Sequence, residues 1–94
     1  KKDIVPVDNA LEKLGKIRGV SFSYKMDGRK TYGVLAEDVK GVFPELIAKD
    51  KNGYDMVDYP ALIGPVIKAV NELSEQNKAL RARVEELENK LQEG

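Results

Sequence analysis

The sequence predicts an α+β protein: a small head of short helices and two β-hairpins, followed by a long C-terminal helix that forms a parallel coiled coil. Apolar residues recur every three or four positions through the last third of the chain, and two turn signals separate short apolar segments nearer the start. The predicted parts are the head, residues 1–60, and the coiled-coil helix, residues 61–94. Together they are expected to act as one functional domain.

The predicted long helix carries a heptad pattern. Charged residues, Gln and Ala fill most of the positions between the members of its stripe, so the stripe is expected to be an oligomer interface. A helix of this length spans roughly 45 Å and would project from the head. The interface residues are Ile63, Val66, Val70, Leu73, Asn77, Leu80, Val84, Leu87 and Leu91. Those from Ile63 to Leu73 are expected to pack against the head as well, and those from Asn77 to Leu91 to serve mainly the neighbouring chains.

The head opens with a helical pattern. Apolar residues from Ala10 to Ile17 share one face, Asp8 or Asn9 can cap the first turn, and Gly19 is expected to end the helix. Polar and apolar residues then alternate.

The alternation predicts a β-hairpin. One strand runs from Val20 to Met26, the pair Asp27-Gly28 favours a tight turn, and the return strand is residues 31–35. Tyr32 and Val34 are its candidate core residues. The other aromatic residues are also expected to pack in the head or between the head and the long helix: Phe22, Tyr24, Phe43, Tyr54 and Tyr59.

A second helix is expected over residues 36–43, stopped by Pro44, because a residue before proline avoids helical angles. Short strands at residues 46–48 and 56–57 flank a turn at residues 50–53 and predict a second hairpin. Asp58 and Pro60 then suit the start of the long helix. Because Pro65 lacks an amide donor, we expect a kink there or a helix that becomes regular only afterwards.

No cofactor and no metal site is predicted. The chain has no His and no Cys, which excludes disulfides, zinc sites and the commonest general base. Oxygen donors do gather near the second turn, but the glycine there is fourth rather than sixth, unlike a calcium-binding EF-hand loop. A turn is therefore favoured. The donors are Asp50, Asn52, Asp55 and Asp58.

Composition also bears on partners. Sixteen basic residues balance sixteen acidic ones, so bulk charge does not favour nucleic acid, and no apolar run reaches the roughly eighteen residues that a membrane span needs. The predicted partner is another copy of the chain. The seam of Val and Leu with one Asn resembles that of two-stranded coiled coils, so a dimer stays open beside a trimer.

Several segments, taken in order, resemble the C-terminal intramolecular chaperone domain of endosialidase-type phage tail spikes and tail fibres. The similar segments are Ala10–Leu11, Arg18–Tyr24, Gly33–Val39, Val42–Leu46 and Val57–Tyr59, followed by the long helix. This resemblance implies a homotrimer that holds three chains in register while the upstream fibre domain of the same polypeptide folds. It also implies self-cleavage, in a tail precursor made in the host cytoplasm, that releases the domain.

Cleavage in that family uses a serine–lysine dyad within a motif Ser-Asp-x-x-Leu-Lys-x-x-Ile. Residues 1–4, Lys-Lys-Asp-Ile, match the end of this motif, so the resemblance makes Lys1 the catalytic lysine. Its serine would lie five residues before Lys1, in a longer parent chain, and the sequence as given is predicted to be inactive. At residues 37–38 this chain has Glu-Asp where the family commonly has Gln-Glu; either pair suits a helix start.

Other classes of protein remain as alternatives. The same domain type occurs in trimeric regulators, so an oligomerisation or adaptor module without a phage role is the second hypothesis. A basic-region zipper needs a dense basic helix before its heptads, whereas the single basic residue among residues 63–74 is Lys68. A free-standing hydrolase is disfavoured because no nucleophile elbow or phosphate loop is present. In either oligomer, Asn77 is expected to set register, and Arg83 and Glu88 to pair between chains.

Overall fold

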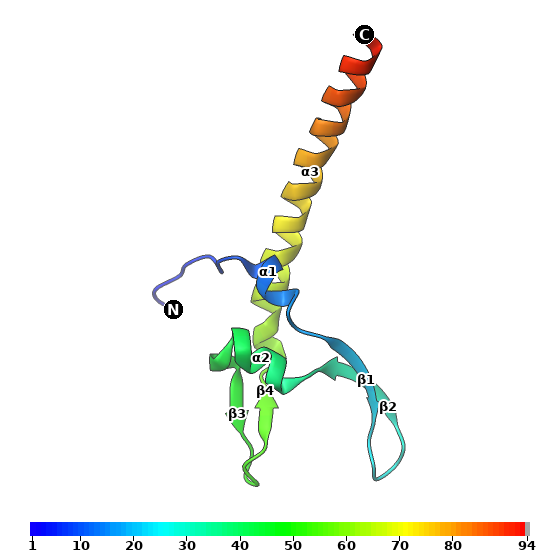
Figure 1. The fold of residues 1–94 in the computed structure, drawn as a ribbon. Coiled ribbons are helices and arrows are strands. Elements are labelled where there is room, and N and C mark those ends of the chain that lie inside the picture. The colour runs from blue at the N-terminus through cyan, green and yellow to red at the C-terminus, as the bar shows by residue number, and fades with distance from the viewer. Residues whose placement is uncertain (94) are drawn as a thin grey trace.

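The computed structural model describes residues 1–93 and confirms the predicted α+β fold, a small head on a long helix (Figure 1). The chain extends over 67 × 40 × 19 Å. No helix among the described residues is both long and apolar enough to cross a membrane. In order, the elements are α1 (Ala10–Leu14), β1 (Gly19–Ser23), β2 (Lys30–Val34), α2 (Ala36–Val42), a 3-10 turn (Pro44–Leu46), β3 (Ile47–Lys49), β4 (Asp55–Val57), a second 3-10 turn (Pro60–Leu62) and α3 (Ile63–Glu93).

The first helix is shorter than predicted. α1 ends at Leu14, with Gly15 as its C-cap, so the expectation of a helix reaching Gly19 is wrong. The amides of Lys16 and Ile17 bond carbonyls only three residues back, which tightens the last turn and redirects the chain into β1. Asn9 has a φ of 49° and its side chain makes no capping bond, so the predicted local cap is also wrong.

Both predicted hairpins form. β1 and β2 are antiparallel, with Ser21 opposite Tyr32, and β3 and β4 are antiparallel, with Ala48 opposite Met56. The two turns contain Gly28 (φ 69°) and Gly53 (φ 85°), in a region that glycine enters without a steric penalty. In Figure 1 the hairpins lie at the end of the head opposite the projecting part of α3.

A small core joins α2 to the base of α3. Val39, Phe43 and Leu62 are buried there, and Val34 packs against them as predicted. Tyr32, however, is 76% exposed, so its predicted core role is wrong. The reason is geometric: a two-stranded hairpin has no second layer to cover it, and only its base reaches the core. The remaining aromatic residues are exposed as well, namely Phe22, Tyr24, Tyr54 and Tyr59.

The long helix begins before its proline rather than after it. α3 starts at Ile63, directly after the 3-10 turn, and Pro65 lies within the first helical turn. Amides of a first turn have no carbonyl partner within the helix, so the missing donor of Pro65 removes no intrahelical bond. Upstream, Asp58 accepts a hydrogen bond from the amide of Ala61 at 3.2 Å, which agrees with its predicted capping role.

Gly33 allows the first hairpin to touch Tyr59. A Cβ atom at this position would lie 2.7 Å from the hydroxyl of Tyr59 and 3.2 Å from the ring of Phe22. The same hydroxyl accepts a hydrogen bond from the amide of Val34 at 3.4 Å. Gly33→Ala should therefore lower stability by about 1–3 kcal/mol, the usual cost of overpacking. Thermal unfolding followed by circular dichroism measures the change.

Gly19→Ala is the matched control, because Gly19 lies opposite Val34 in the same hairpin and a Cβ there would meet nothing within 4 Å. It should leave the melting temperature nearly unchanged. Equal losses in the two variants would show that the contact with Tyr59 does not set the cost at Gly33.

Candidate self-association surface

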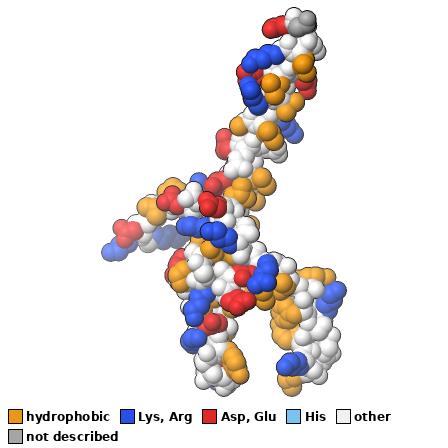
Figure 2. All heavy atoms as spheres, viewed as in Figure 1, with side chains coloured by type: hydrophobic (Ala, Val, Ile, Leu, Met, Phe, Trp, Pro, Cys, Tyr) orange, Lys and Arg blue, Asp and Glu red, His pale blue; other side chains and the backbone are white. Residues whose placement is uncertain are grey.

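The nine predicted interface residues form a continuous exposed stripe along α3, here called the seam. Its eight apolar members are between 42% exposed (Val66) and 81% exposed (Leu91), and Asn77 is exposed among them. In Figure 2 hydrophobic side chains follow the projecting part of the helix between charged ones. Fully burying one such side chain contributes about 1.5–3 kcal/mol. The single chain therefore leaves much of its available hydrophobic stabilisation unused.

The head contacts a different stripe of the helix. Leu62, Pro65 and Ala69 are buried and Glu72 is half-buried, each one position before a seam residue. A shift of one position turns the direction of a side chain by about 100° around the helix. The expectation that residues 63–73 of the seam pack on the head is thus corrected: this neighbouring stripe makes the contact, and the seam stays open beside it.

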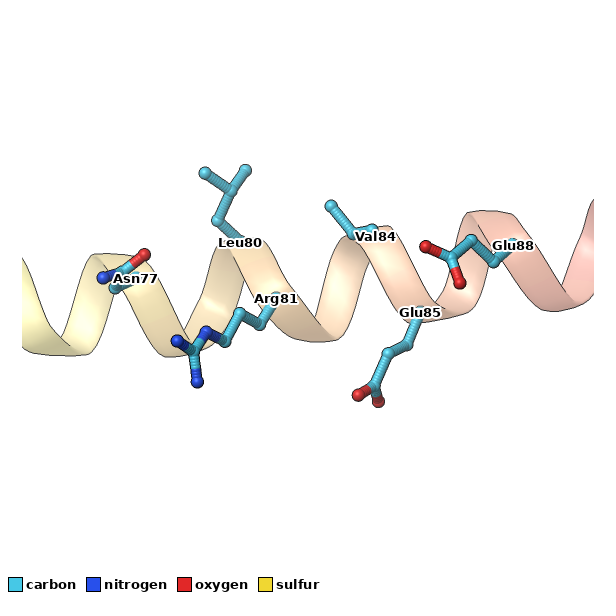
Figure 3. A pocket seen from close by; sticks show the side chains of 6 residues that line it. All are labelled: Asn77, Leu80, Arg81, Val84, Glu85 and Glu88. Carbon is cyan, nitrogen blue, oxygen red and sulfur yellow. The ribbon is translucent and has the colours of Figure 1, made fainter.

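Farther along α3 the seam borders a shallow hollow of about 410 Å³. Figure 3 shows Leu80 and Val84 pointing to the same side, whereas Arg81 and Glu85 point away from them. An apolar ridge beside charged side chains is the arrangement by which one helix packs against another in a coiled coil. The residues lining the hollow are Asn77, Leu80, Arg81, Val84, Glu85 and Glu88.

The flanks of the seam carry ion pairs within the helix. Arg83 lies 3.0 Å from Glu86, and Lys90 lies 3.4 Å from the same carboxylate. Such exposed pairs contribute little to stability, typically below 1 kcal/mol. Pairing of Arg83 with Glu88 of another chain stays a prediction.

Glu72 holds the first helix against the long one. One of its carboxylate oxygens accepts hydrogen bonds from the amides of Ala10 (2.8 Å) and Leu11 (3.4 Å). These amides belong to the first turn of α1, and amides of a first turn have no carbonyl acceptor within their own helix. α3 thus supplies the cap that Asn9 does not provide. Sequence reasoning missed this contact because sixty-two residues separate Glu72 from Ala10, and no local pattern signals it.

A second clamp joins the segment after α1 to the start of α2. Asp38 accepts three hydrogen bonds from Arg18: from its backbone amide (3.0 Å), from Nε (3.0 Å) and from Nη2 (3.1 Å). Glu37 lies 3.3 Å from the same guanidinium. Hydrogen bonds from Arg18 lower the pKa of Asp38 below its ordinary value. Asp38 therefore orients the chain between α1 and β1, a role beyond the predicted helix start.

Lys1, the lysine matched to the family's dyad, is exposed at the start of the segment that leads to α1. In Figure 1 this end of the chain lies to the side of α3. Among residues 1–93 its side chain forms no ion pair. The nearest anchors along the chain are Val7, which packs against the core, and Ala10, which is held by Glu72.

The acidic residues among the oxygen donors near the second turn have structural partners. Asp50 accepts hydrogen bonds from the amides of Asn52 (2.8 Å) and Tyr54 (2.9 Å), which closes the turn. Asp55 lies 2.6 Å from the ammonium group of Lys49, and a hydrogen bond from that group lowers its pKa. Over the described part of the chain, no group of three or more acidic residues is arranged to hold a metal ion.

A small head on a long helix with an uncovered heptad stripe is typical of domains that associate through their helices. The chain belongs to the family described as chaperone of endosialidase, whose pattern matches residues 1–48. It is also 34% identical, over 82 residues, to the Long tail fiber protein Gp37 of Escherichia phage AR1. That match covers 77% of this chain and 7% of the relative, so the chain spans only a small part of the tail fibre protein's length.

Proposed function

We propose that this chain is an intramolecular chaperone that holds three copies in register while an upstream phage tail spike or tail fibre folds. The exposed seam of α3 carries this proposal: eight large apolar side chains on one stripe require a cover, and an identical helix provides one. Membership of the chaperone of endosialidase family and the similarity to a phage long tail fibre protein support the phage role. Residues 1–60 and 61–94 would then serve as head and clamp of one domain.

The proposed assembly is a parallel homotrimer. Asn77 lies on the seam among apolar residues, and its amide finds partners only when the corresponding residues of the other chains are level with it. This requirement would keep the three chains in register. A dimer is the runner-up, since a seam of Val, Leu and Asn separates the two states only weakly.

The second half of the proposal is release by self-cleavage. The family motif places a serine nucleophile five residues before Lys1, in the longer parent chain, and Lys1 would act as its base. A lysine base needs removal from water or a neighbouring cation. Lys1 is exposed in the single chain, so burial would come from neighbouring copies, with Lys2 as the adjacent cation. Cleavage would then follow assembly, in a tail precursor made in the host cytoplasm.

Light scattering on the purified chain tests the association. The expected result is three times the monomer mass, because the resemblance to chaperone domains of trimeric fibres implies threefold symmetry. A monomer would overturn the proposal. A dimer would still be consistent with an oligomerisation module but not with a trimeric fibre, and would therefore favour the adaptor alternative.

A further inference from the structure

The first helix and the long helix border an open apolar hollow of about 310 Å³ beside the seam. Leu11 and Leu14 line it from α1, and Val66, Val70 and Leu73 line it from α3. Two hydrogen bonds to Glu72 hold the start of α1 against the same helix and so position one wall of the hollow. Nothing in the described chain fills it, yet its walls are almost wholly apolar.

Ile67 is an exposed apolar side chain of the kind that fills such a hollow. It is 55% exposed and directly follows Val66 in the sequence. With Ile63 and Val70 at position a of the heptad and Val66 at position d, Ile67 occupies position e, at the edge of the seam. The same heptad position, e, is occupied farther along α3 by Ser74, Arg81 and Glu88, all polar. An apolar residue thus occurs at this edge only at the level of the head, where the hollow also lies.

Ile67 lies on the side of α3 that faces away from α1. At about 100° per residue, Ile67 lies roughly 140–200° around the helix from the residues that contact the head, Leu62, Pro65, Ala69 and Glu72. The side chain of Ile67 therefore points away from α1, and it is not among the residues that line the hollow of its own chain. Along the axis, however, it is level with the hollow to within about one helical turn, which is 5.4 Å.

In a parallel coiled coil, the e edge of one helix faces the g edge of the next. Leu62 and Ala69 occupy the g positions here, and both are buried by the head: Leu62 in the core with Val39 and Phe43, and Ala69 beside α1. We propose that Ile67 of each copy seats in the hollow between α1 and α3 of the neighbouring copy. This inference rests on the proposed association and makes α1, a part of the head, a component of the interface. In a closed ring, each copy inserts its Ile67 into the hollow of one neighbour and accommodates the Ile67 of the other.

Disulfide cross-linking tests the contact, because the chain contains no cysteine. Two double variants are needed, Leu11→Cys with Ile67→Cys and Leu14→Cys with Ile67→Cys. At least one should form covalent dimers and trimers on mild oxidation, resolved on a non-reducing gel. A bond within one chain would leave the mass of a single chain on the gel, so covalent dimers and trimers report contacts between copies. Leu11→Cys with Arg81→Cys is the matched control: it uses the same helix edge about 21 Å farther along, and should stay uncross-linked.

A second measurement does not depend on cysteine. Ile67→Ser should raise the concentration at which the assembly half-dissociates by roughly tenfold, since an apolar side chain that is buried on association is lost. Met26→Ser is its control, because Met26 is fully exposed at the tip of the first hairpin. It should leave association unchanged.

The outcomes separate this inference from the proposed function. A trimer that yields no cross-link in either double variant and is unaffected by Ile67→Ser would overturn the inference and leave the chaperone proposal standing. An unmodified chain that remains monomeric would overturn both. Cross-linked trimers together with weaker association of the Ile67→Ser variant would support the proposed seating.

Discussion

Replacing Leu80 with aspartate should convert the assembled chain into monomers. Leu80 lies at the middle of the seam and is 63% exposed in the single chain, so its loss removes little from the folded monomer. In a trimer the same substitution would bring three carboxylates together in an apolar layer, and burying unpaired charge costs several kcal/mol. A cost of about 4 kcal/mol corresponds to association weakened about a thousandfold.

Sedimentation or light scattering across a concentration series measures this effect, and circular dichroism checks that the helix persists. Ala82→Asp is the matched control: it adds the same charge two residues away, on the outer side of the helix, and should remain assembled. An undiminished trimer in the Leu80→Asp variant would show that the seam is not the interface.

Lys1→Ala should abolish self-cleavage in a chain extended upstream to include the serine that the family motif requires. Loss of a positioned general base typically slows a reaction by a factor of about 10²–10⁴. The measurement is the appearance of the released domain over time, followed by gel and by mass spectrometry of the new N-terminus. Association should be unaffected, because Lys1 lies outside the seam.

Two arginine variants separate a base from a mere positive charge. Lys1→Arg keeps the charge but cannot give up its proton near neutral pH, so it should also fail to cleave. Lys2→Arg keeps the neighbouring cation and should cleave at nearly the normal rate. Normal cleavage by the Lys1→Ala variant would mean that another lysine serves as the base.

Local patterns were sufficient for most of the fold. The intervals of three and four along α3 reflect helical geometry directly, and Gly28 and Gly53 mark turns because their positive φ angles suit glycine. The seam could be predicted for the same reason, since a helix presents residues of one heptad stripe to one side whatever precedes it. Lys1 could be assigned as the dyad lysine only through resemblance to a family, because no local sequence pattern distinguishes it from other exposed lysines.

Contacts between distant segments decided the rest. Glu72 caps α1 from sixty-two residues away, and Arg18 binds Asp38 across a gap of twenty residues. The choice of Leu62, Pro65 and Ala69 as the head-facing stripe follows from where the head docks on α3, which no periodicity specifies. Sequence periodicity therefore established that the long helix has an apolar stripe for a partner. Only the packed structure showed that the head covers the adjacent stripe and leaves the seam free, because tertiary contacts depend on which surfaces the chain brings together.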